Sequence, residues 1–343
     1  MGAPKLLCDT KGMNRERWLE CREHGPDGDI EYTLGGSDVS TVFGVNPWTT
    51  PLELFQMKRG LLKQSDDDNA GRKKMGHLME PVVAYWYREM TGNQLIEDSG
   101  LYQHADYPYA LANLDYRVVN GDGHGVLDCK TTSWRNAEEW ADGAIPYRYD
   151  LQVRFYMAVM DFDYADLACM WGFDAEKEMA IRSIRRDRDI EKLIFERLDE
   201  FIGRLCSGSP PTMSDVDPEQ AMKALARVYH TSVPNQPTIE FGKKHERPLR
   251  RIAVLQADNY NLSKKIEKNE TEVTALSVKI AEMMGAHERG LLETAFDKLV
   301  VSYVPKTIKR VDSKLLKKDH PLIYDAVLHP SISRKVRVEV QAK

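Results

Sequence analysis

The feature that most constrains the fold is a pair of strand-like runs joined by a glycine-rich turn. The runs are "YALANLDYRVV" and "GVLDCKTTS", and the connection "NGDGHG" contains Gly121, Gly123 and Gly125. Glycine readily adopts the positive φ values that hairpin turns require. We therefore expect the two runs to pair as antiparallel strands.

The register of this hairpin decides which side chains share a face. We expect Val119 to lie opposite Val126, which places Asp115 opposite Lys130. Because side chains alternate along a strand, Asp128 then lies on the same face as Lys130. The shared face carries Asp115, Arg117, Asp128 and Lys130.

Two carboxylates and a lysine on one sheet face have a chemical use. Carboxylate oxygens are the ligands that Mg²⁺ and Mn²⁺ prefer, and a nearby ammonium can orient or help to deprotonate a water and stabilise charge on a phosphate. A cross-strand salt bridge on a solvated face explains the same residues equally well. The hairpin alone leaves both interpretations open.

Size and composition indicate a folded protein of one or two domains, because 343 residues of which 42% are hydrophobic can form one substantial core and a smaller unit. No apolar run reaches the roughly 20 residues that span a bilayer, and no signal peptide is recognisable, so we expect a cytoplasmic protein. The five cysteines are widely spaced without a CxxC pair, which is typical of reduced thiols.

Charge is distributed unevenly along the chain. The net charge is −5, yet residues 243–343 hold 21 Lys and Arg against 13 Asp and Glu. The acidic remainder is consistent with a metal site and the basic end with a polyanion partner. Two solvated surfaces of opposite sign explain the same numbers.

Proline and glycine mark a boundary after the helix-like segment "IEKLIFERLDEFIGRL", where "CSGSPPTMSDVDPEQ" follows. We expect a first domain over residues 1–212, a linker over 213–248, and a helical and basic accessory region over 249–343. In that region "FDKLVVSYV" and "SRKVRVEV" predict strands on either side of a short helix.

Residues 249–285 keep a seven-residue hydrophobic spacing, which predicts a long helix with an apolar seam. One chain supplies only about five heptads, and two seam positions are asparagine. An intramolecular helical hairpin is therefore the favoured interpretation.

Two further polar residues lie on predicted helices. "MGHLMEPVVAYWYREMTG" predicts a helix around Pro81, which either occupies the first turn or kinks the helix. Glu80 is then a metal ligand or an acid near a helix N-terminus. "YDLQVRFYMAVM" predicts a helix with Gln152 beside its apolar stripe, where surface or capping glutamines are common.

Six motifs follow one another in order over residues 14–205. They are "WLECR", "GGSDVSTVFGVNPWTTPLELFQMKRG", "GHLMEP", "LD", "LDCKT" and "LQVRFYM". In this order they resemble the YqaJ-like phage recombinase nucleases, relatives of lambda exonuclease in the PD-(D/E)xK superfamily. The resemblance implies a restriction-endonuclease-like α/β fold with a central mixed sheet flanked by helices. It also implies DNA as the substrate and Mg²⁺, with Mn²⁺ able to substitute, as the cofactor.

Roles in catalysis follow from the resemblance residue by residue. Asp115 and Asp128 would hold the metal, Lys130 would assist the attacking water, and Glu80 would be an additional ligand. Gln152 matches the family's motif glutamine near the site. The acid before the lysine is aspartate where the family commonly has glutamate, and a tyrosine follows Asp115 where glycine is usual.

Recognition of DNA ends also follows from the resemblance. Arg22 and Ser37 match the positions that grip the 5′-terminal phosphate in lambda-type exonucleases, although this chain has additional residues between them. A guanidinium offers two parallel donors to a phosphate, and a serine offers a hydroxyl.

The sequence therefore predicts a Mg²⁺-dependent 5′ to 3′ exonuclease that digests linear double-stranded DNA ends in phage-type recombination, in the cytoplasm of a bacterial or phage-infected cell. The resemblance implies a ring-like homo-oligomer and a single-strand annealing partner. One alternative is an endonuclease or helicase-associated nuclease of the same superfamily. The other is a DNA-binding mediator without activity, against which the intact Asp115, Asp128 and Lys130 argue.

Overall fold

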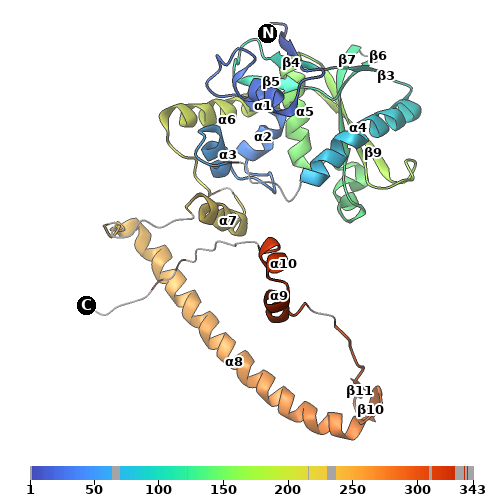
Figure 1. Cartoon of the computed structure of the whole chain (residues 1–343), viewed down its shortest axis with the longest axis vertical. Helices are drawn as coiled ribbons and strands as arrows, with labels where there is room; N and C mark the ends of the chain where they lie inside the picture. Colours follow the sequence, from blue (N-terminus) through green and yellow to red (C-terminus); the bar gives the residue numbers. More distant parts are fainter. Residues whose placement is uncertain are drawn as a thin grey trace. The chain divides into compact units, whose positions relative to one another are not determined.

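The computed structural model describes residues 2–63, 70–121, 123–214, 216–229, 237–308, 311–328, 336 and 338. The chain divides into two compact units, Met1–His230 and Thr231–Lys343 (Figure 1). We call them unit 1 and unit 2 and describe each by itself. No described helix is long and apolar enough to cross a membrane.

Unit 1 is built around a five-stranded sheet with the strand order β3-β6-β7-β8-β9. The β7 and β8 strands run parallel, whereas the other neighbours are antiparallel, so the sheet is mixed. The strands are β3 (Gln94–Glu97), β6 (Tyr116–Asn120), β7 (Gly123–Thr131), β8 (Tyr164–Met170) and β9 (Met179–Arg185).

A second sheet of four strands has the order β1-β4-β5-β2. Its β2 and β5 strands are parallel and the other pairs are antiparallel. The strands are β1 (Lys5–Asp9), β2 (Leu34–Gly35), β4 (Gly100–Gln103) and β5 (Ala110–Asn113). The β5 and β6 strands follow each other closely, so the second sheet leads directly into the hairpin of the five-stranded sheet.

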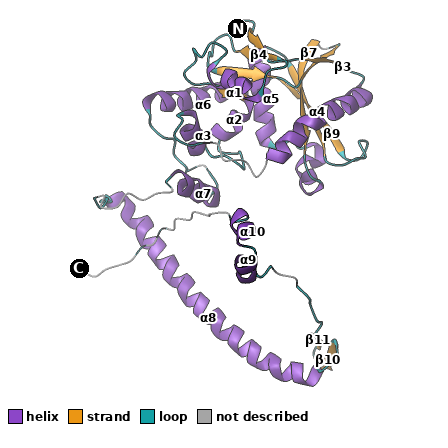
Figure 2. Cartoon of the chain, in the orientation of Figure 1, coloured by secondary structure: helices purple, strands orange, loops and turns teal. Residues whose placement is uncertain are grey.

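Helices flank the sheets of unit 1 (Figure 2). The parallel β7 and β8 strands need a crossover, which α5 supplies together with a short 3-10 segment. The helical elements are α1 (Arg15–His24), α2 (Gly36–Val42), α3 (Pro51–Lys58), α4 (Ala70–Thr91), η1 (Trp134–Gly143), α5 (Tyr147–Met160), α6 (Arg188–Ser207) and α7 (Pro218–Val228).

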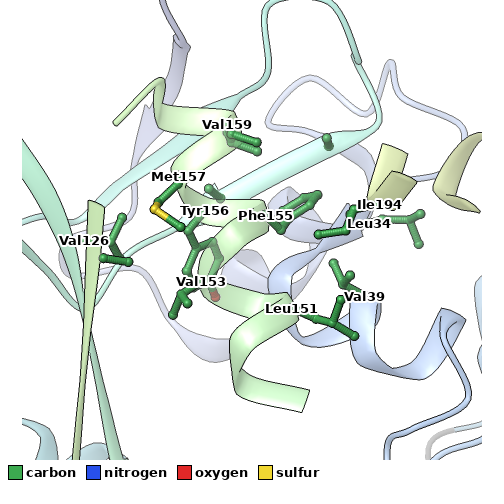
Figure 3. Packing of buried hydrophobic residues seen from close by; sticks show 14 of the residues in the cluster. Leu34, Val39, Val126, Leu151, Val153, Phe155, Tyr156, Met157, Val159 and Ile194 are labelled. Atoms are coloured by element: carbon green, nitrogen blue, oxygen red, sulfur yellow. The ribbon is translucent and has the colours of Figure 1, made fainter. Parts of the chain in front are cut away.

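The two faces of β7 pack against different helices. Val126 belongs to a hydrophobic cluster with α5, and Figure 3 shows α5 between this valine and Val39 and Ile194. Leu127, the next residue, belongs to a second cluster with Val83 of α4. The predicted fold class, a mixed sheet flanked by helices with a long C-terminal helix, is confirmed.

The hairpin forms as predicted, but its register was predicted wrongly by two residues. Val119 lies opposite His124 instead of Val126, and the ladder continues to the pair Asn120 and Gly123. Only two residues then connect the strands, which is the favoured length for a tight hairpin. Arg117 consequently pairs with Val126, and its side chain forms an ion pair with Asp98 of unit 1.

The structure settles the helical positions of two prolines. Pro81 lies in the interior of α4, more than two turns from its start, which excludes the first-turn alternative and leaves the kink as a prediction. Pro218 does not break structure but begins α7, because Asp217 caps the helix by accepting from the Gln220 N–H. Proline suits the first helical turn, whose N–H groups lack intrahelical acceptors.

The segment expected to be a linker therefore contains a helix that packs on unit 1. Arg227 of α7 lies 2.8 Å from Oε1 of the buried Glu53 of α3, and Gln220 donates to the backbone oxygen of Asn46. These contacts group α7 with unit 1 and place the division between the units near residue 230. An end of the nuclease domain near residue 212 stays a prediction.

Unit 2 contains a helix of 39 residues, α8 (Glu246–Met284), drawn as one unbroken element in Figure 2. The long helix predicted over residues 249–285 is confirmed, whereas the favoured interpretation, an intramolecular hairpin of this segment, is wrong because α8 is continuous and has no turn. The predicted strand within 296–304 and the short helix form, whereas the strand predicted at 333–340 falls outside the described residues, 336 and 338 excepted. The other elements are η2 (Lys243–His245), β10 (Arg289–Glu293), β11 (Lys298–Ser302), α9 (Ser313–Asp319) and α10 (Pro321–Ala326).

Candidate active site

Asp115 and Asp128 meet at the end of the hairpin. Asp115 immediately precedes β6, and continuing the observed register by one residue places it opposite Asp128 of β7. The Cys129 N–H donates to Asp115 Oδ2 over 2.8 Å and fixes this carboxylate against the strand. The structure therefore brings together the two acids that the sequence singled out.

The acid pair carries negative charge that its surroundings do not neutralise fully. Burial, followed by the charge of Asp128, raises the pKa of Asp115 from its ordinary value to about 8, and the charge of Glu80 adds to the effect. Lys130 and the Cys129 N–H act in the opposite direction without cancelling it. A bound cation would relieve this repulsion.

Lys130 lies beside the acid pair. Its Nζ is 2.6 Å from Asp128 Oδ2, and it also lies 5.3 Å from the centre of the Tyr149 ring. Burial lowers the pKa of the ammonium, but the charges of Asp128 and then Asp115 outweigh burial and raise the pKa above its ordinary value. Lys130 is therefore held as an ammonium that can donate hydrogen bonds.

Asp128 has one oxygen engaged and one still able to accept. Gln152 of α5 donates through Nε2 to Asp128 Oδ1 over 3.3 Å. The buried Oδ2 is paired with the Lys130 ammonium at 2.6 Å, and no other described residue donates to it. A carboxylate oxygen has two lone pairs, so Oδ2 can also bind a further ligand.

Glu80 is at the edge of the site. Its side chain is 28% exposed on α4, and its Oε1 lies 2.8 Å from Nδ1 of His77, one helical turn earlier. Its charge reaches Asp115, as the pKa of Asp115 shows. Its place in α4 excludes the role at a helix N-terminus that was its alternative.

The donor set fits a hard divalent cation bound in part by the substrate. Within the described ranges, no three His, Cys, Asp or Glu side chains are gathered closely enough to form a ready metal cluster. Mg²⁺ is usually held by one or two carboxylates, with water and substrate phosphate completing its coordination. Asp115 and Asp128 provide such carboxylates.

Arg22 and Ser37 also come together. The guanidinium Nη2 of Arg22 in α1 donates to Ser37 Oγ over 2.7 Å, and the guanidinium carbon lies 5.2 Å from the centre of the Trp18 ring. The additional residues between Arg22 and Ser37 therefore do not separate them.

A carboxylate holds the positive charge in place beside Ser37. Burial raises the pKa of Asp38, but the charges of Lys58 and Arg22 outweigh it and lower the pKa below its ordinary value. The Lys58 Nζ is 3.2 Å from Asp38 Oδ2, which also accepts from the Gly35 N–H. The cluster thus contains two cations and one acid.

Tyr156 joins the two groups of residues, and the sequence analysis missed it. Its Oη accepts from Gln152 Nε2 over 3.0 Å, and its ring occupies the space that a side chain at Gly36 would need. Burial and then the charge of Asp128 raise its pKa to about 12, while Lys130 and Arg22 lower it. The sequence pattern that could have identified Tyr156 is its position one helical turn after Gln152 on α5.

Arg148 and Tyr149 were also missed. The Arg148 guanidinium lies 4.6 Å from the Tyr149 ring centre and 5.8 Å from that of Trp48, which is 60% exposed. Tyr149 in turn contacts Lys130. Both residues begin α5, but a tyrosine and an arginine before an apolar stripe carry no distinctive sequence signal.

The fold and the site together define an α/β protein whose central hairpin presents an acid pair and a lysine. Residues 17–163 match the family model of the YqaJ-like viral recombinase domain. The resemblance found in the sequence is thereby confirmed.

Individual relatives cover different shares of the chain. The chain is 26% identical to the uncharacterized protein YqaJ of Bacillus subtilis (strain 168) over 326 residues, which are 94% of this chain and 93% of that protein. An alkaline exonuclease from Laribacter hongkongensis is similar with a TM-score of 0.45 and 19% identity, covering 57% of this chain and 94% of that one. A phage-related exonuclease from Haemophilus somnus 129PT has a TM-score of 0.39 and 14% identity, covering 51% and 96%.

Proposed function

We propose that this chain is a Mg²⁺-dependent deoxyribonuclease that hydrolyses phosphodiester bonds at the ends of linear duplex DNA, with 5′ to 3′ polarity. The observation that carries the proposal is the acid pair, whose burial and mutual repulsion raise the pKa of Asp115 to about 8 beside the Lys130 ammonium. An uncompensated acid pair next to a fixed cation suits a site that binds a metal and a phosphate.

The divalent cation would be held by Asp115 and Asp128, with Glu80 as a further ligand, and would polarise the scissile phosphate and lower the pKa of a water. Lys130 donates from its ammonium to the attacking water or to a phosphate oxygen, because its raised pKa keeps the proton on Nζ. It stabilises the negative charge that develops during in-line attack. This role corresponds to the assisting lysine that the resemblance implies.

Gln152 and Tyr156 keep the acid in position. Gln152 donates an amide N–H to Asp128 Oδ1, which leaves Oδ2 to face Lys130 and a bound cation. The same Nε2 also donates to Tyr156, whose ring is confined next to Gly36. Rotation of Asp128 is therefore restricted by two neighbours.

The Arg22 and Ser37 cluster supports an exonuclease. Arg22 and Ser37 provide the donors for a terminal phosphate, and Lys58 adds positive charge. Tyr156 is influenced by the charges of both Arg22 and Asp128, so one side chain lies between the two groups. A phosphate held by Arg22 would keep the cleaved bond close to the end of the strand.

Incubation with linear and covalently closed circular duplex DNA, each with Mg²⁺ and with EDTA, tests the proposal. An exonuclease degrades only the linear DNA and only with the cation. Nicking of the circle would instead indicate an endonuclease, and two intact substrates would indicate a non-catalytic DNA-binding mediator. A homo-oligomer and a single-strand annealing partner stay predictions from the family resemblance.

A further inference from the structure

The α8 helix has almost no core of its own. Among its 39 residues only Met284, the last, is buried. Helices in water owe most of their stability to the packing of an apolar face, and ion pairs such as that between Arg250 and Glu246 add little. An exposed helix of this length therefore indicates a missing partner.

The apolar residues of α8 follow a heptad repeat that defines one face, which we call the seam. The first seam row is Ile252, Asn259, Ile266, Val273 and Ile280. The second row is Leu255, Leu262, Asn269, Leu276 and Met283. Representative members are far from buried, since Ile266 is 57% and Val273 is 61% exposed.

The residue types in the two rows indicate how many helices form the coiled coil. β-Branched residues occupy four of five positions in the first row, and leucine occupies three of five in the second. Isoleucine or valine in the first row with leucine in the second favours a two-stranded parallel coiled coil. Neither row has the pattern that favours trimers or tetramers.

The two asparagines determine the orientation of the helices. In a parallel pair in register, Asn259 faces Asn259 of the second copy and Asn269 faces Asn269, so each amide has an amide partner. In the fully overlapping antiparallel pair, Asn259 faces Leu276 and Asn269 faces Ile266. An amide buried against an aliphatic side chain loses its hydrogen bonds with water and gains none. An antiparallel pair shifted by one heptad brings Asn259 opposite Asn269, but it leaves Ile280 and Met283 without partners in the seam. The parallel pair alone matches both asparagines along the whole seam.

Charges beside the seam permit either orientation. The parallel pair places Lys265 beside Glu270 of the second copy and creates no contact between like charges. The antiparallel pair places Asp258 beside Lys279 and Lys265 beside Glu272. Exposed ion pairs contribute less than the cost of a buried unpaired amide, so the asparagines decide in favour of the parallel pair.

We propose that the α8 seam pairs in parallel and in register with the same seam of a second copy of this chain. The two chains would be joined through Glu246–Met284, with Ile266 and Val273 near the middle of the contact. This association does not depend on the nuclease function proposed above.

A matched pair of valines tests whether the seam is the interface. Val273 lies in the seam, whereas Val278 lies on the opposite side of α8 and is 53% exposed. Sedimentation equilibrium of the full chain should give the mass of two chains rather than that of the ring-like assembly that the family resemblance implies. Val273→Glu should raise the dissociation constant at least about 100-fold because it buries a charge, whereas Val278→Glu should leave it unchanged.

Charge exchange tests the orientation. In a parallel pair, Lys265→Glu and Glu270→Lys should each weaken association roughly three- to tenfold, and the double exchange should restore it. In the antiparallel pair the exchanged residue at 265 meets Glu272, so the double exchange would not rescue association. Far-UV circular dichroism at high concentration checks that every variant keeps its helical content.

Three results would overturn the proposal. The first is a wild-type chain that is monomeric at about 10 μM, a concentration at which a micromolar or tighter association is largely formed. The second is an assembly larger than two chains, and the third is equal effects of Val273→Glu and Val278→Glu. Failure of the charge rescue would overturn the parallel arrangement.

Discussion

The two units of this chain obtain their structure in opposite ways. In the described residues, every buried hydrophobic side chain lies in unit 1 except Met284. Unit 1 packs Phe155, Phe195 and Leu198 into its main cluster, whereas α8 exposes its apolar seam. A unit with its own core can keep a cluster of like charges buried, whereas a unit without a core depends on association with another chain.

The largest expected effect tests whether DNA cleavage depends on the acid pair and the lysine of unit 1. Asp128→Ala and Lys130→Ala should each reduce the rate of DNA cleavage by roughly 1,000-fold or more, because they remove charge that acts directly on the reacting phosphate. Steady-state digestion of end-labelled linear DNA measures this. Asp174→Ala, which removes an exposed carboxylate of unit 1, is the control and should retain activity.

Substitutions of apolar residues test whether the two units differ in what stabilises them. Phe155→Ala should lower the free energy of unfolding of unit 1 by about 3–5 kcal/mol, because a fully buried aromatic side chain leaves a cavity. All six tryptophans lie between Trp18 and Trp171, so tryptophan fluorescence during urea denaturation reports on unit 1. Leu276→Ala should not move that transition, and a shift as large as that of Phe155→Ala would show that the units do not differ in this way.

A third prediction concerns the electrostatic repulsion in unit 1. The pKa of Asp115 is about 8 in the folded protein against 3.8 ordinarily, so the folded state binds more protons than the unfolded state between these pH values. The free energy of unfolding of the metal-free protein should therefore fall as pH rises through this interval. Asp115→Asn keeps an oxygen for the Cys129 N–H but has no charge, so it should stabilise the protein more at pH 8 than at pH 5.

Thermal unfolding in EDTA measures the effect of Asp115→Asn, with Asp174→Asn as a control that should show no such gain. Addition of Mg²⁺ should stabilise the wild type more than Asp115→Asn. Identical pH profiles for wild type and Asp115→Asn would mean that the acid pair is not under repulsion.

The smallest expected effects concern phosphate binding, in which the two units are expected to play different roles. Arg22→Ala should remove any preference for 5′-phosphorylated over 5′-hydroxyl ends, because it deletes the guanidinium beside Ser37. Lys317→Ala with Lys318→Ala in α9 should instead weaken binding to both ends equally and make it less salt-dependent. Competition binding at two salt concentrations separates the two outcomes, and a preference that survives Arg22→Ala would contradict the end-binding role.

The sequence predicts which side chains share a strand face because side chains repeat every two residues along a strand. The register was wrong by two residues, yet Asp128 and Lys130 still share the face that packs towards α5. The alternation of Val126 and Leu127 between two clusters confirms the assignment of faces. A register error of one residue would have placed these side chains on the opposite face of the sheet.

Other features depend on contacts that no local pattern encodes. Tyr156 looks like an ordinary core aromatic, and only its contact with Gly36 and its bond from Gln152 connect it with the site. The α7 helix was taken for a linker because Pro218 suggests a break, although Asp217 caps a helix there. The basic C-terminal region was expected to meet a polyanion, and two of its residues, Lys309 and Arg310, lie outside the described residues.

The close contact of Gly36 with Tyr156 has a consequence for how relatives of this chain diverge. A Cβ at position 36 would lie 2.5 Å from Cε1 of the Tyr156 ring, so the two positions share one space. Substitutions at these positions should therefore be correlated among homologues. Where an alanine or serine replaces Gly36, a smaller side chain should replace Tyr156, and such exchanges should be accompanied by a different partner for the glutamine that orients Asp128.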